Sequence, residues 1–255
     1  MNAYWIAFQT IVVKETMRFV RIWPQTVLPA VVTTTLYFII FGRLMGERIG
    51  PMDQMAYIDF IAPGMILMTV ITNSYANVVS SFYSGKFQRH VEELLVAPVP
   101  NGVILAGYVC GGILRGLAVG LAVGGVAAWF VDFHPHSPLL VLLVFVLTSA
   151  VFATGGFINA VFANSFDDIS IVPTFVLTPL TYLGGVFYSI DLLPAVWQKV
   201  SLFNPILYMV NAFRYGIYGV SDIAIGWALA IMLGFLASLS AVALYLLHKG
   251  IGIKS

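Results

Sequence analysis

Residues 103–131 read VILAGYVCGGILRGLAVGLAVGGVAAWFV, and Arg115 is the only charged residue in the run. About 20 consecutive apolar residues are enough for a helix to cross the hydrocarbon core of a bilayer, which is about 30 Å thick. This stretch is therefore predicted to be a transmembrane helix. Other long apolar runs with few charges in the chain are interpreted in the same way.

The whole chain has the composition of a membrane protein. Of its 255 residues, 60% are hydrophobic and 9% are charged, and the mean hydropathy is +0.95. Soluble domains carry about 25% charged residues. The apolar runs are continuous rather than alternating, which excludes a β-barrel. The net charge of +1 indicates no nucleic-acid partner, and the single cysteine, Cys110, excludes an intrachain disulfide or a multi-cysteine metal cluster.

Six apolar stretches are long enough to span the bilayer, so the chain is predicted to be one all-α membrane domain, residues 1–255, with six transmembrane helices. The predicted spans are residues 24–45, 58–82, 103–131, 139–163, 169–188 and 224–247. Residues 189–222 are too long for a turn and too apolar for a solvated loop. Because unpaired backbone is not tolerated in lipid, they are predicted to form short re-entrant helices on the outer side.

The first 23 residues are predicted to form an amphipathic helix lying in the membrane interface, and their charges argue against a cleavable signal peptide. Apolar side chains recur on one face at helical spacing: they are Trp5, Phe8, Val12, Phe19 and Trp23. Lys14, Arg18 and Arg21 fall on the opposite face and are expected to point toward anionic headgroups. The alternative is packing on a soluble domain, and the sequence contains no such domain.

The distribution of lysine and arginine favours cytoplasmic N- and C-termini, because basic residues are enriched in cytoplasmic loops. In this orientation the inner basic residues are Lys14, Arg18, Arg21, Lys86, Arg89, Lys249 and Lys254. The outer ones are Arg43, Arg48, Lys199 and Arg214.

The third span carries four glycines at a spacing of four: Gly112, Gly116, Gly120 and Gly124. Such a ridge lets another helix approach closely. The neighbour is either a helix of the same chain or a second copy, and the former is favoured in a six-helix subunit.

No catalytic motif is present, and no cofactor is expected in this chain. The sequence lacks a G-x-x-x-x-G-K-[ST] phosphate loop, an H-E-x-x-H helix and a G-x-S-x-G elbow. His134 and His136 are interpreted as ordinary loop residues rather than metal ligands. The acidic residues are expected in loops or at span ends, which argues against a carrier that binds its coupling ion at mid-membrane.

The second span has a polar stripe at helical spacing: Thr69, Asn73, Asn77, Ser80 and Ser84. It either holds the bundle together through hydrogen bonds or forms one wall of a substrate passage. Arg115 is the one deep charge of the third span. It is expected to snorkel, to pair across the bundle or to face a polar cavity.

Residues 85–98 are predicted to form a short amphipathic helix at the cytoplasmic mouth, ended by Pro98 and Pro100. It is expected to dock on a soluble partner. The residues predicted to make this contact are Lys86, Arg89, Glu92, Glu93, Leu94 and Leu95.

Three segments together resemble a known family. VEELLVAPVP at 91–100 followed by NGVILAGYV resembles the coupling-helix region of type-2 ABC transporter permeases. DDISIVPTFVLTPLTYLGGVFY at 167–188 is similar to the family's fifth span, and NPILYMVNAFRYG at 204–216 to its re-entrant segment. The resemblance covers the whole chain, including the interfacial first helix. Within the family, the sequence most resembles the small bacterial YadH-like and nodulation-type permeases.

The resemblance implies the membrane-spanning permease of an ATP-driven exporter in the bacterial inner membrane. It implies a homodimer paired with two copies of a cytosolic ATPase that binds ATP and Mg²⁺, and transport by alternating access. The first, second and fifth spans of such permeases line the pathway. That placement singles out Tyr37, Asn73, Asn77, Thr178 and Tyr182.

Pro173 and Pro179 are expected to bend the fifth span and to serve gating, although prolines also shape packing alone. The aromatic content favours an amphiphilic or lipid-linked substrate. A secondary carrier or flippase that works without ATP is the main alternative, and a membrane scaffold or sensor is another.

Overall fold

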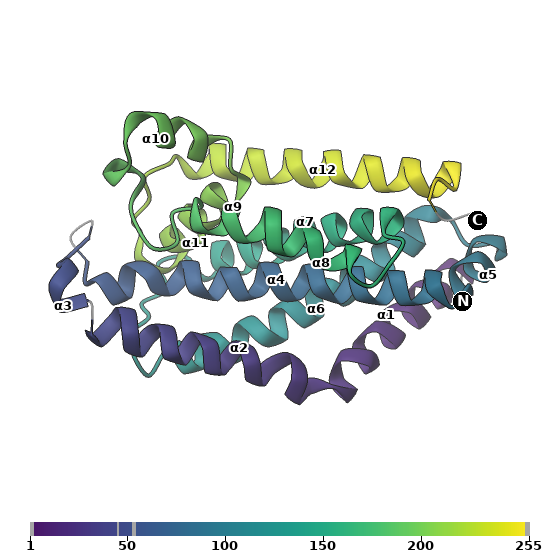
Figure 1. Cartoon of the computed structure of the whole chain (residues 1–255), viewed down its shortest axis with the longest axis horizontal. Helices are drawn as coiled ribbons and strands as arrows, with labels where there is room; N and C mark the ends of the chain where they lie inside the picture. The colour runs from purple at the N-terminus through teal and green to yellow at the C-terminus, as the bar shows by residue number, and fades with distance from the viewer. Residues whose placement is uncertain (1–2, 45, 53–54, 253–255) are drawn as a thin grey trace.

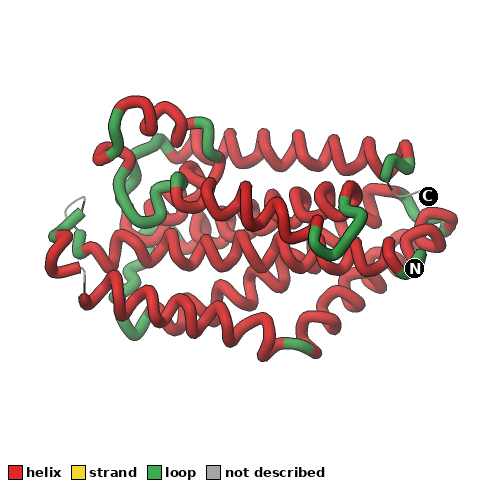
Figure 2. Tube along the Cα trace, in the orientation of Figure 1, coloured by secondary structure: helices red, strands yellow, loops and turns green. Residues whose placement is uncertain are grey.

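The computed structural model describes residues 3–44, 46–52 and 55–252. Within those ranges the regular elements are all helices, apart from one isolated bridge between Met52 and Met55. The helices form an elongated bundle joined mostly by short loops (Figures 1 and 2). Lys254, counted above among the inner basic residues, lies outside the described ranges, as do the side chains of Arg43 and Glu47.

Five helices in the described part of the chain are long and apolar enough to cross a membrane. They are Trp23–Gly42, Tyr57–Phe87 (α4), Asn101–Ala127 (α6), Pro138–Phe162 (α7) and Ile225–Lys249 (α12). The first consists of α2 (Trp23–Tyr37) continued by the π-helix η1 (Phe38–Leu44). These helices correspond to the predicted first, second, third, fourth and sixth spans. The largest difference is in α4, which continues to Phe87 where the predicted span ended at residue 82.

The predicted fifth span, residues 169–188, is shorter and interrupted. It consists of α8 (Asp168–Val172), the π-helix η2 (Pro173–Leu177) and α9 (Thr178–Tyr182). Three segments of five residues each extend about 22 Å at 1.5 Å per residue, less than the hydrocarbon thickness of about 30 Å. The helix ends before Gly185, whose φ of +70° is incompatible with its continuation. A sixth continuous span is therefore not confirmed.

Residues 189–222 form short helices, as predicted: η3 (Ile190–Leu192), α10 (Ala195–Leu202) and α11 (Pro205–Tyr218). α10 is exposed at one end of the bundle, whereas α11 is buried against α4, α7 and α12 (Figure 1). Asn204 caps α11, because its Oδ1 accepts from the Ile206 N–H and its Nδ2 donates to the Leu180 carbonyl. Whether these helices are re-entrant stays a prediction.

Arg214 does not belong to the outer surface where the charge count placed it. Its side chain is 1% exposed, and its guanidinium lies 3.7 Å from the ring centroid of Phe60. Its Nη2 donates to the carbonyl of Gly185 over 2.8 Å. A buried guanidinium must satisfy its donors inside the protein. The contacts of Arg214 therefore connect α11 to α4 and to the loop after α9.

The first helix, α1 (Ala3–Arg21), is amphipathic as expected, but the predicted direction of its basic face is wrong for Arg18. The buried residues of α1 are Ile11, Glu15 and Phe19, and this face packs on α6. Arg18 points into the bundle, where Nη2 donates to the backbone carbonyl of Asn77 over 2.6 Å. The apolar side chain of Trp5 is exposed on the surface of the bundle, where the predicted interfacial position would place it against lipid.

α4 runs the length of the bundle and packs against α6 and α7 (Figure 1). Lipid is as apolar as the helix surfaces, so close packing rather than water exclusion must hold these helices together. Glycines of α6 provide it. A Cβ on Gly112 would lie 2.7 Å from the Cβ of Ala153 on α7, and one on Gly116 or Gly120 would overlap side chains of α4 and α7. Gly124 has a looser environment, with the nearest atom, on Ile66, 4.0 Å away.

The two ends of the bundle differ. The helix α5 (His90–Val96) and both chain ends gather at one end, and α3 (Gly46–Ile49) and α10 lie at the other (Figure 1). α5 follows a sharp turn at Arg89, whose φ of 62° is left-handed and strained for a residue other than glycine. The predicted cytoplasmic helix thus exists, but as a seven-residue helix separated from α4 rather than a continuous 85–98 segment.

Candidate functional site

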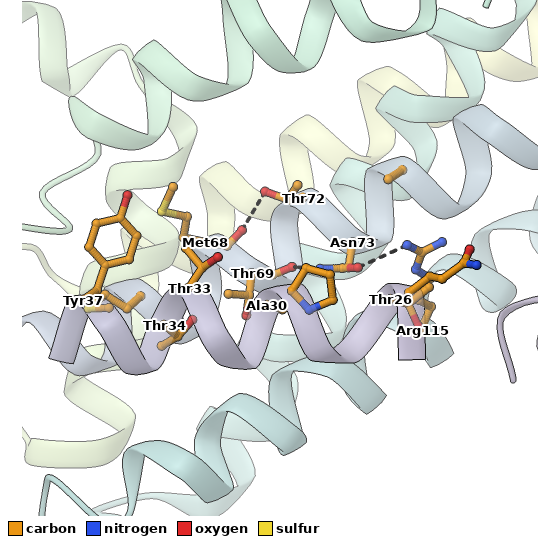
Figure 3. Close-up of a pocket in the computed structure, with 14 residues that line it drawn as sticks. Thr26, Ala30, Thr33, Thr34, Tyr37, Met68, Thr69, Thr72, Asn73 and Arg115 are labelled. Carbon is orange, nitrogen blue, oxygen red and sulfur yellow. Dashed lines mark hydrogen bonds between the residues drawn. The ribbon is translucent and has the colours of Figure 1, made fainter. Parts of the chain in front are cut away.

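A cavity of about 350 Å³ lies between α2, α4 and α6. Threonines of α2 and α4 give it a row of hydroxyl groups, and Met65, Met68 and Pro29 give it apolar wall. Arg115 of α6 reaches one end, and Tyr37 of α2 lies at the other (Figure 3). The cavity is therefore amphipathic, with a single positive charge at one end.

The polar stripe of α4 serves two purposes in two halves. Thr69 and Asn73 line the cavity, and Asn73 Oδ1 accepts a hydrogen bond of 3.2 Å from Arg115 Nη2 (Figure 3). Asn77 and Ser80 instead bind Arg18 of α1. The hydrogen-bonding role of the stripe is thus confirmed for Asn77 and Ser80, and the substrate-passage role of Thr69 and Asn73 stays a prediction.

A buried carboxylate was missed by the sequence interpretation, which expected acidic residues only in loops and at span ends. Glu15 of α1 is fully buried between α1, α4 and α6. Its Oε1 accepts a hydrogen bond from Ser81 Oγ over 2.5 Å, and its Oε2 lies 3.5 Å from Arg18 Nη2. The sequence did contain a signal for this contact. Gly107 and Gly111 of α6 are four residues apart, as are Ile11 and Glu15 of α1, and in the structure Gly107 packs against Ile11 and Gly111 against Glu15.

An aromatic cluster surrounds Tyr37, the residue at one end of the cavity. Phe187, in the loop after α9, contacts Tyr37, Phe41 and Tyr182, with ring centroids 6.2, 5.8 and 5.7 Å away. Contacts in this range are favourable between aromatic rings. The cluster joins the first span to the fifth helical segment. Phe41 and Phe187 were not predicted from the sequence, where nothing distinguished them from other membrane aromatics.

The five predicted pathway residues do not all share this site. Tyr37 and Asn73 line the cavity, and Tyr182 joins it through Phe187. Asn77 is fully buried in the network with Glu15 and Arg18. Thr178 is exposed on the fifth segment, and its Oγ1 donates to the Pro173 carbonyl within its own helix.

The fifth segment changes its helical winding at the two predicted bend points. The π-helix η2 begins at Pro173, and α9 begins at Thr178, directly before Pro179. The backbone N–H of Thr178 donates to the carbonyl of Pro173, five residues earlier. A proline lacks a donor N–H, so the wider turn is a local response to a broken α-helical pattern.

The predicted docking residues of α5 divide into exposed and packed groups. Glu92 and Glu93 are exposed, whereas Leu94 and Leu95 pack in part against the core. The helix is anchored by Val91, which is buried, and the apolar side chain that it exposes is Val96, 87% accessible. Val96 is thus a stronger candidate for a partner contact than either leucine.

The two basic residues of this region also differ. Arg89 is exposed at the strained turn. Lys86 turns inward, and its Nζ donates to the carbonyls of Val161 and Ala163 over 2.7 Å each, at the C-terminus of α7. A cation at this position also interacts favourably with the helix dipole.

Aromatic contacts tie the root of α5 to the start of the fifth segment. Phe166, in the loop between α7 and α8, packs edge-on against Tyr83 and Phe87 of α4, with centroids 4.9 and 5.4 Å away. Phe87 is 66% exposed. The C-terminal end of α4, from which the chain turns into α5, and the loop that precedes α8 therefore share a packed aromatic cluster.

The sequence profile of the family described as "ABC-2 type transporter" matches residues 6–218, most of the chain and all the elements that form the cavity. The chain belongs to the ABC-2 transporter family. It is 54% identical over 255 residues to "Inner membrane transport permease YadH" of Escherichia coli strain K12, covering all of both chains. It is 27% identical over 180 residues to "Nodulation protein J" of Rhizobium leguminosarum bv. viciae, covering 70% of each.

Membership confirms the family expected from residues 91–100, 167–188 and 204–216. Family membership supports a membrane permease of an ABC transporter. The residue roles within the cavity are argued next.

Proposed function

We propose that this chain is the permease subunit of an ATP-driven exporter of the bacterial inner membrane, with both termini in the cytoplasm. Two copies form the translocation pathway and associate with two copies of a separate cytosolic ATPase, which binds ATP and Mg²⁺. The substrate is an amphiphilic or lipid-linked molecule that moves outward by alternating access. The observation that carries the proposal is the amphipathic cavity between α2 and α4 in a chain of the ABC-2 family.

The lining of the cavity supports an amphiphilic substrate. Its hydroxyl groups and Arg115 offer hydrogen bonds to a polar head, and Met65, Met68 and Tyr37 offer contacts to an apolar part. Binding sites for small molecules commonly combine an apolar wall with a few oriented polar groups. The cluster around Phe187 contacts Tyr37 at the far end, so a substrate leaving by that end would have to pass it.

The position of the cluster supports a gating role for the fifth segment. Phe187 follows α9 directly in the chain, and the preceding helix is interrupted at Pro173 and Pro179. Helices wound in this way bend more readily than a regular α-helix. A tilt of α9 would separate Tyr182 and Phe187 from Tyr37 and open the cavity.

The end that carries α5 supports coupling to an ATPase. Phe87 and Val96 form an exposed apolar pair, and Glu92 and Glu93 add charge beside them. Apolar anchors surrounded by polar residues are the usual composition of a protein interface. The aromatic contact of Phe87 with Phe166 then gives a direct route from α5 to the fifth segment.

The proposal predicts that a soluble P-loop ATPase is encoded near this gene, and it is tested by co-expressing the chain with that ATPase. We expect the two to copurify and to hydrolyse ATP in lipid nanodiscs, with neither protein doing so alone. Copurification that fails in both detergent and nanodiscs, or ATP hydrolysis that does not depend on the permease, would overturn it.

The docking surface is tested by substitution. Phe87→Ser with Val96→Ser should weaken recruitment of the ATPase, because loss of a buried apolar anchor at an interface costs about 1–2 kcal/mol or more. Leu94→Ala with Leu95→Ala should act partly through packing, since these leucines already contact the core. Neither pair should alter membrane insertion. The readout is the ATPase-to-permease ratio after copurification.

A secondary carrier is the second candidate, and the buried carboxylate of Glu15 is the observation that favours it. Proton-coupled carriers use buried acidic residues. In this chain, however, Glu15 pairs with Arg18 and accepts hydrogen bonds from Ser81 and Asn77. Transport into vesicles that persists without ATP and collapses with the proton gradient would favour the carrier.

A further inference from the structure

Arg115 has no acidic partner in the part of the chain that the structure describes. The nearby guanidinium of Arg18, in contrast, pairs with Glu15. Arg115 Nη2 donates to Asn73 Oδ1 over 3.2 Å, and its Nε is buried without a partner. A guanidinium placed near the centre of a transmembrane helix is costly, so such residues generally serve a function.

The guanidinium does not reach the end of its helix. Arg115 lies about midway along α6 (Asn101–Ala127), with glycine at 116 and leucines at 114 and 117. Its side chain instead points between α2 and α4, toward Asn73 and into the cavity (Figure 3). Of the three roles considered for it, snorkelling, pairing and facing a polar cavity, the geometry corresponds to the third.

The lining of the cavity is polar near Arg115 and more apolar farther from it. Thr26 and Asn73 are the labelled polar groups nearest to the guanidinium end, and Met68 lies farther along toward Tyr37 (Figure 3). Gln25 and Met65 also line the cavity. A volume of about 350 Å³ lies within the range of small-molecule sites. A molecule with one polar end and one apolar end fits this arrangement in a single direction.

The local charge selects the sign of the polar end. Arg18 of α1 is paired with Glu15, whereas Arg115 has no salt bridge to a carboxylate among the residues that the structure describes. Guanidinium groups bind carboxylate and phosphate through two parallel hydrogen bonds, and such charge-assisted bonds are about twice as strong as neutral ones. A neutral headgroup would satisfy the hydroxyls but leave the charge uncompensated.

We propose that this cavity binds the anionic headgroup of an amphiphile, with its phosphate or carboxylate on Arg115 and its apolar part toward Met65, Met68 and Tyr37. This assignment rests on the proposed transport function for its physiological meaning. Binding itself requires neither ATP nor the ATPase. A failed binding test therefore leaves the exporter assignment standing, and a failed ATPase test leaves the binding site standing.

The test is direct binding to the full-length permease in phosphatidylcholine nanodiscs without the ATPase. The probe is a fluorescent lysophosphatidic acid, compared by anisotropy with the matching uncharged monoacylglycerol. We expect the wild-type protein to bind the anionic probe at least ten-fold more tightly than the neutral one. Arg115→Gln should reduce this preference to less than two-fold, and Arg115→Lys should retain part of it.

Lys199→Gln is the matched control, since it removes an exposed positive charge on α10, far from the cavity in the fold. It should keep the full preference. Each variant is first checked for assembly by size-exclusion chromatography, and Arg115→Lys provides a folded reference if Arg115→Gln assembles poorly. Equal affinity of the wild-type protein for the two probes, or an unchanged preference in Arg115→Gln, would overturn the proposal.

The source of the anion is resolved by competition. Nanodiscs with 20% phosphatidylglycerol should displace the probe if the site holds a bilayer lipid. Undiminished binding in those nanodiscs identifies the occupant as an amphiphile other than this lipid, as expected for a transported substrate. Either result places an anionic headgroup at Arg115, whereas displacement by inorganic phosphate alone would show that the apolar wall contributes nothing and would contradict the amphiphile.

Discussion

Glu15 of α1 and Ser81 of α4 share a hydrogen bond of 2.5 Å between Oε1 and Oγ, although 66 residues separate them in the chain. The carboxylate is fully buried, and Arg18, one turn later on α1, balances its charge. In lipid, such polar contacts between helices replace the hydrophobic effect that would join them in water. The pair therefore fixes α1 to the bundle rather than leaving it free at the interface.

The first prediction concerns this attachment. Ser81→Ala should lower the stability of the purified permease by about 1–3 kcal/mol, because it removes a hydrogen bond to a charged and buried group. Glu15→Ala should have a larger effect, since it also leaves Arg18 without its carboxylate. Thermal unfolding in detergent measures both. Ser84→Ala, on the same helix, makes no side-chain hydrogen bond in the described part of the chain and should be nearly silent; equal effects of Ser81→Ala and Ser84→Ala would refute the attachment.

The second prediction uses the glycine ridge of α6. A Cβ on Gly116 would overlap Ser74 Oγ and lie 2.9 Å from Ser149 Oγ, whereas one on Gly125 would meet nothing within 4 Å. Gly116→Ala should therefore destabilise the bundle by about 1–3 kcal/mol through overpacking. Gly125→Ala should be neutral or slightly stabilising, because alanine favours helix over glycine. The readout is the melting temperature and the yield of assembled protein, and indistinguishable variants would show that the ridge is not packed.

The sequence predicted the elements whose signal is local. The spans around residues 103–131, 139–163 and 224–247 are long apolar runs, and length with hydropathy is sufficient to locate them. The fifth span is not confirmed as a continuous helix, because the apolar composition continues to residue 188 whereas the helix stops at Tyr182, before the turn at Gly185. Apolar composition alone does not indicate where a helix ends.

Part of the candidate site was also beyond a local interpretation. The stripe on α4 showed that polar groups share one face, but not that Asn73 would meet Arg115 and Asn77 would meet Arg18. That division depends on where α1 and α6 cross α4. The basic face of α1 was assigned to headgroups because charges normally avoid the bundle, and this expectation does not hold when Glu15 provides a partner.

The third prediction concerns topology, and the structure refines the choice of positions. In a Cys110→Ala background, cysteines at His90 and Lys249 should react with reagents from the cytoplasmic side, and cysteines at Ile49 and His134 from the outside. All four residues are exposed, and the first pair lies at the opposite end of the bundle from the second (Figure 1). Gly50 and Gly250 are avoided because both have a positive φ. Labelling of position 90 from the outside in intact cells would reverse the orientation.

The last prediction separates structure from coupling at the end that carries α5. Lys86 Nζ binds two terminal carbonyls of α7, so Lys86→Met should lower the stability of the permease by about 1–3 kcal/mol. Glu92→Gln with Glu93→Gln should leave stability unchanged, since both carboxylates are exposed, and should lower ATP turnover of the assembled complex. Thermal unfolding of the permease alone and ATP hydrolysis per complex measure the two effects separately.

Lys249→Met is the matched control for Lys86→Met, because it removes an exposed lysine at the same end of the molecule without breaking a hydrogen bond in the described residues. It should change neither readout. If Lys86→Met instead kept the melting temperature and weakened ATPase recruitment, its ammonium group would belong to the docking surface. The carbonyls of Val161 and Ala163 would then be satisfied by other donors, and the root of α5 would be more mobile than its contacts with α7 imply.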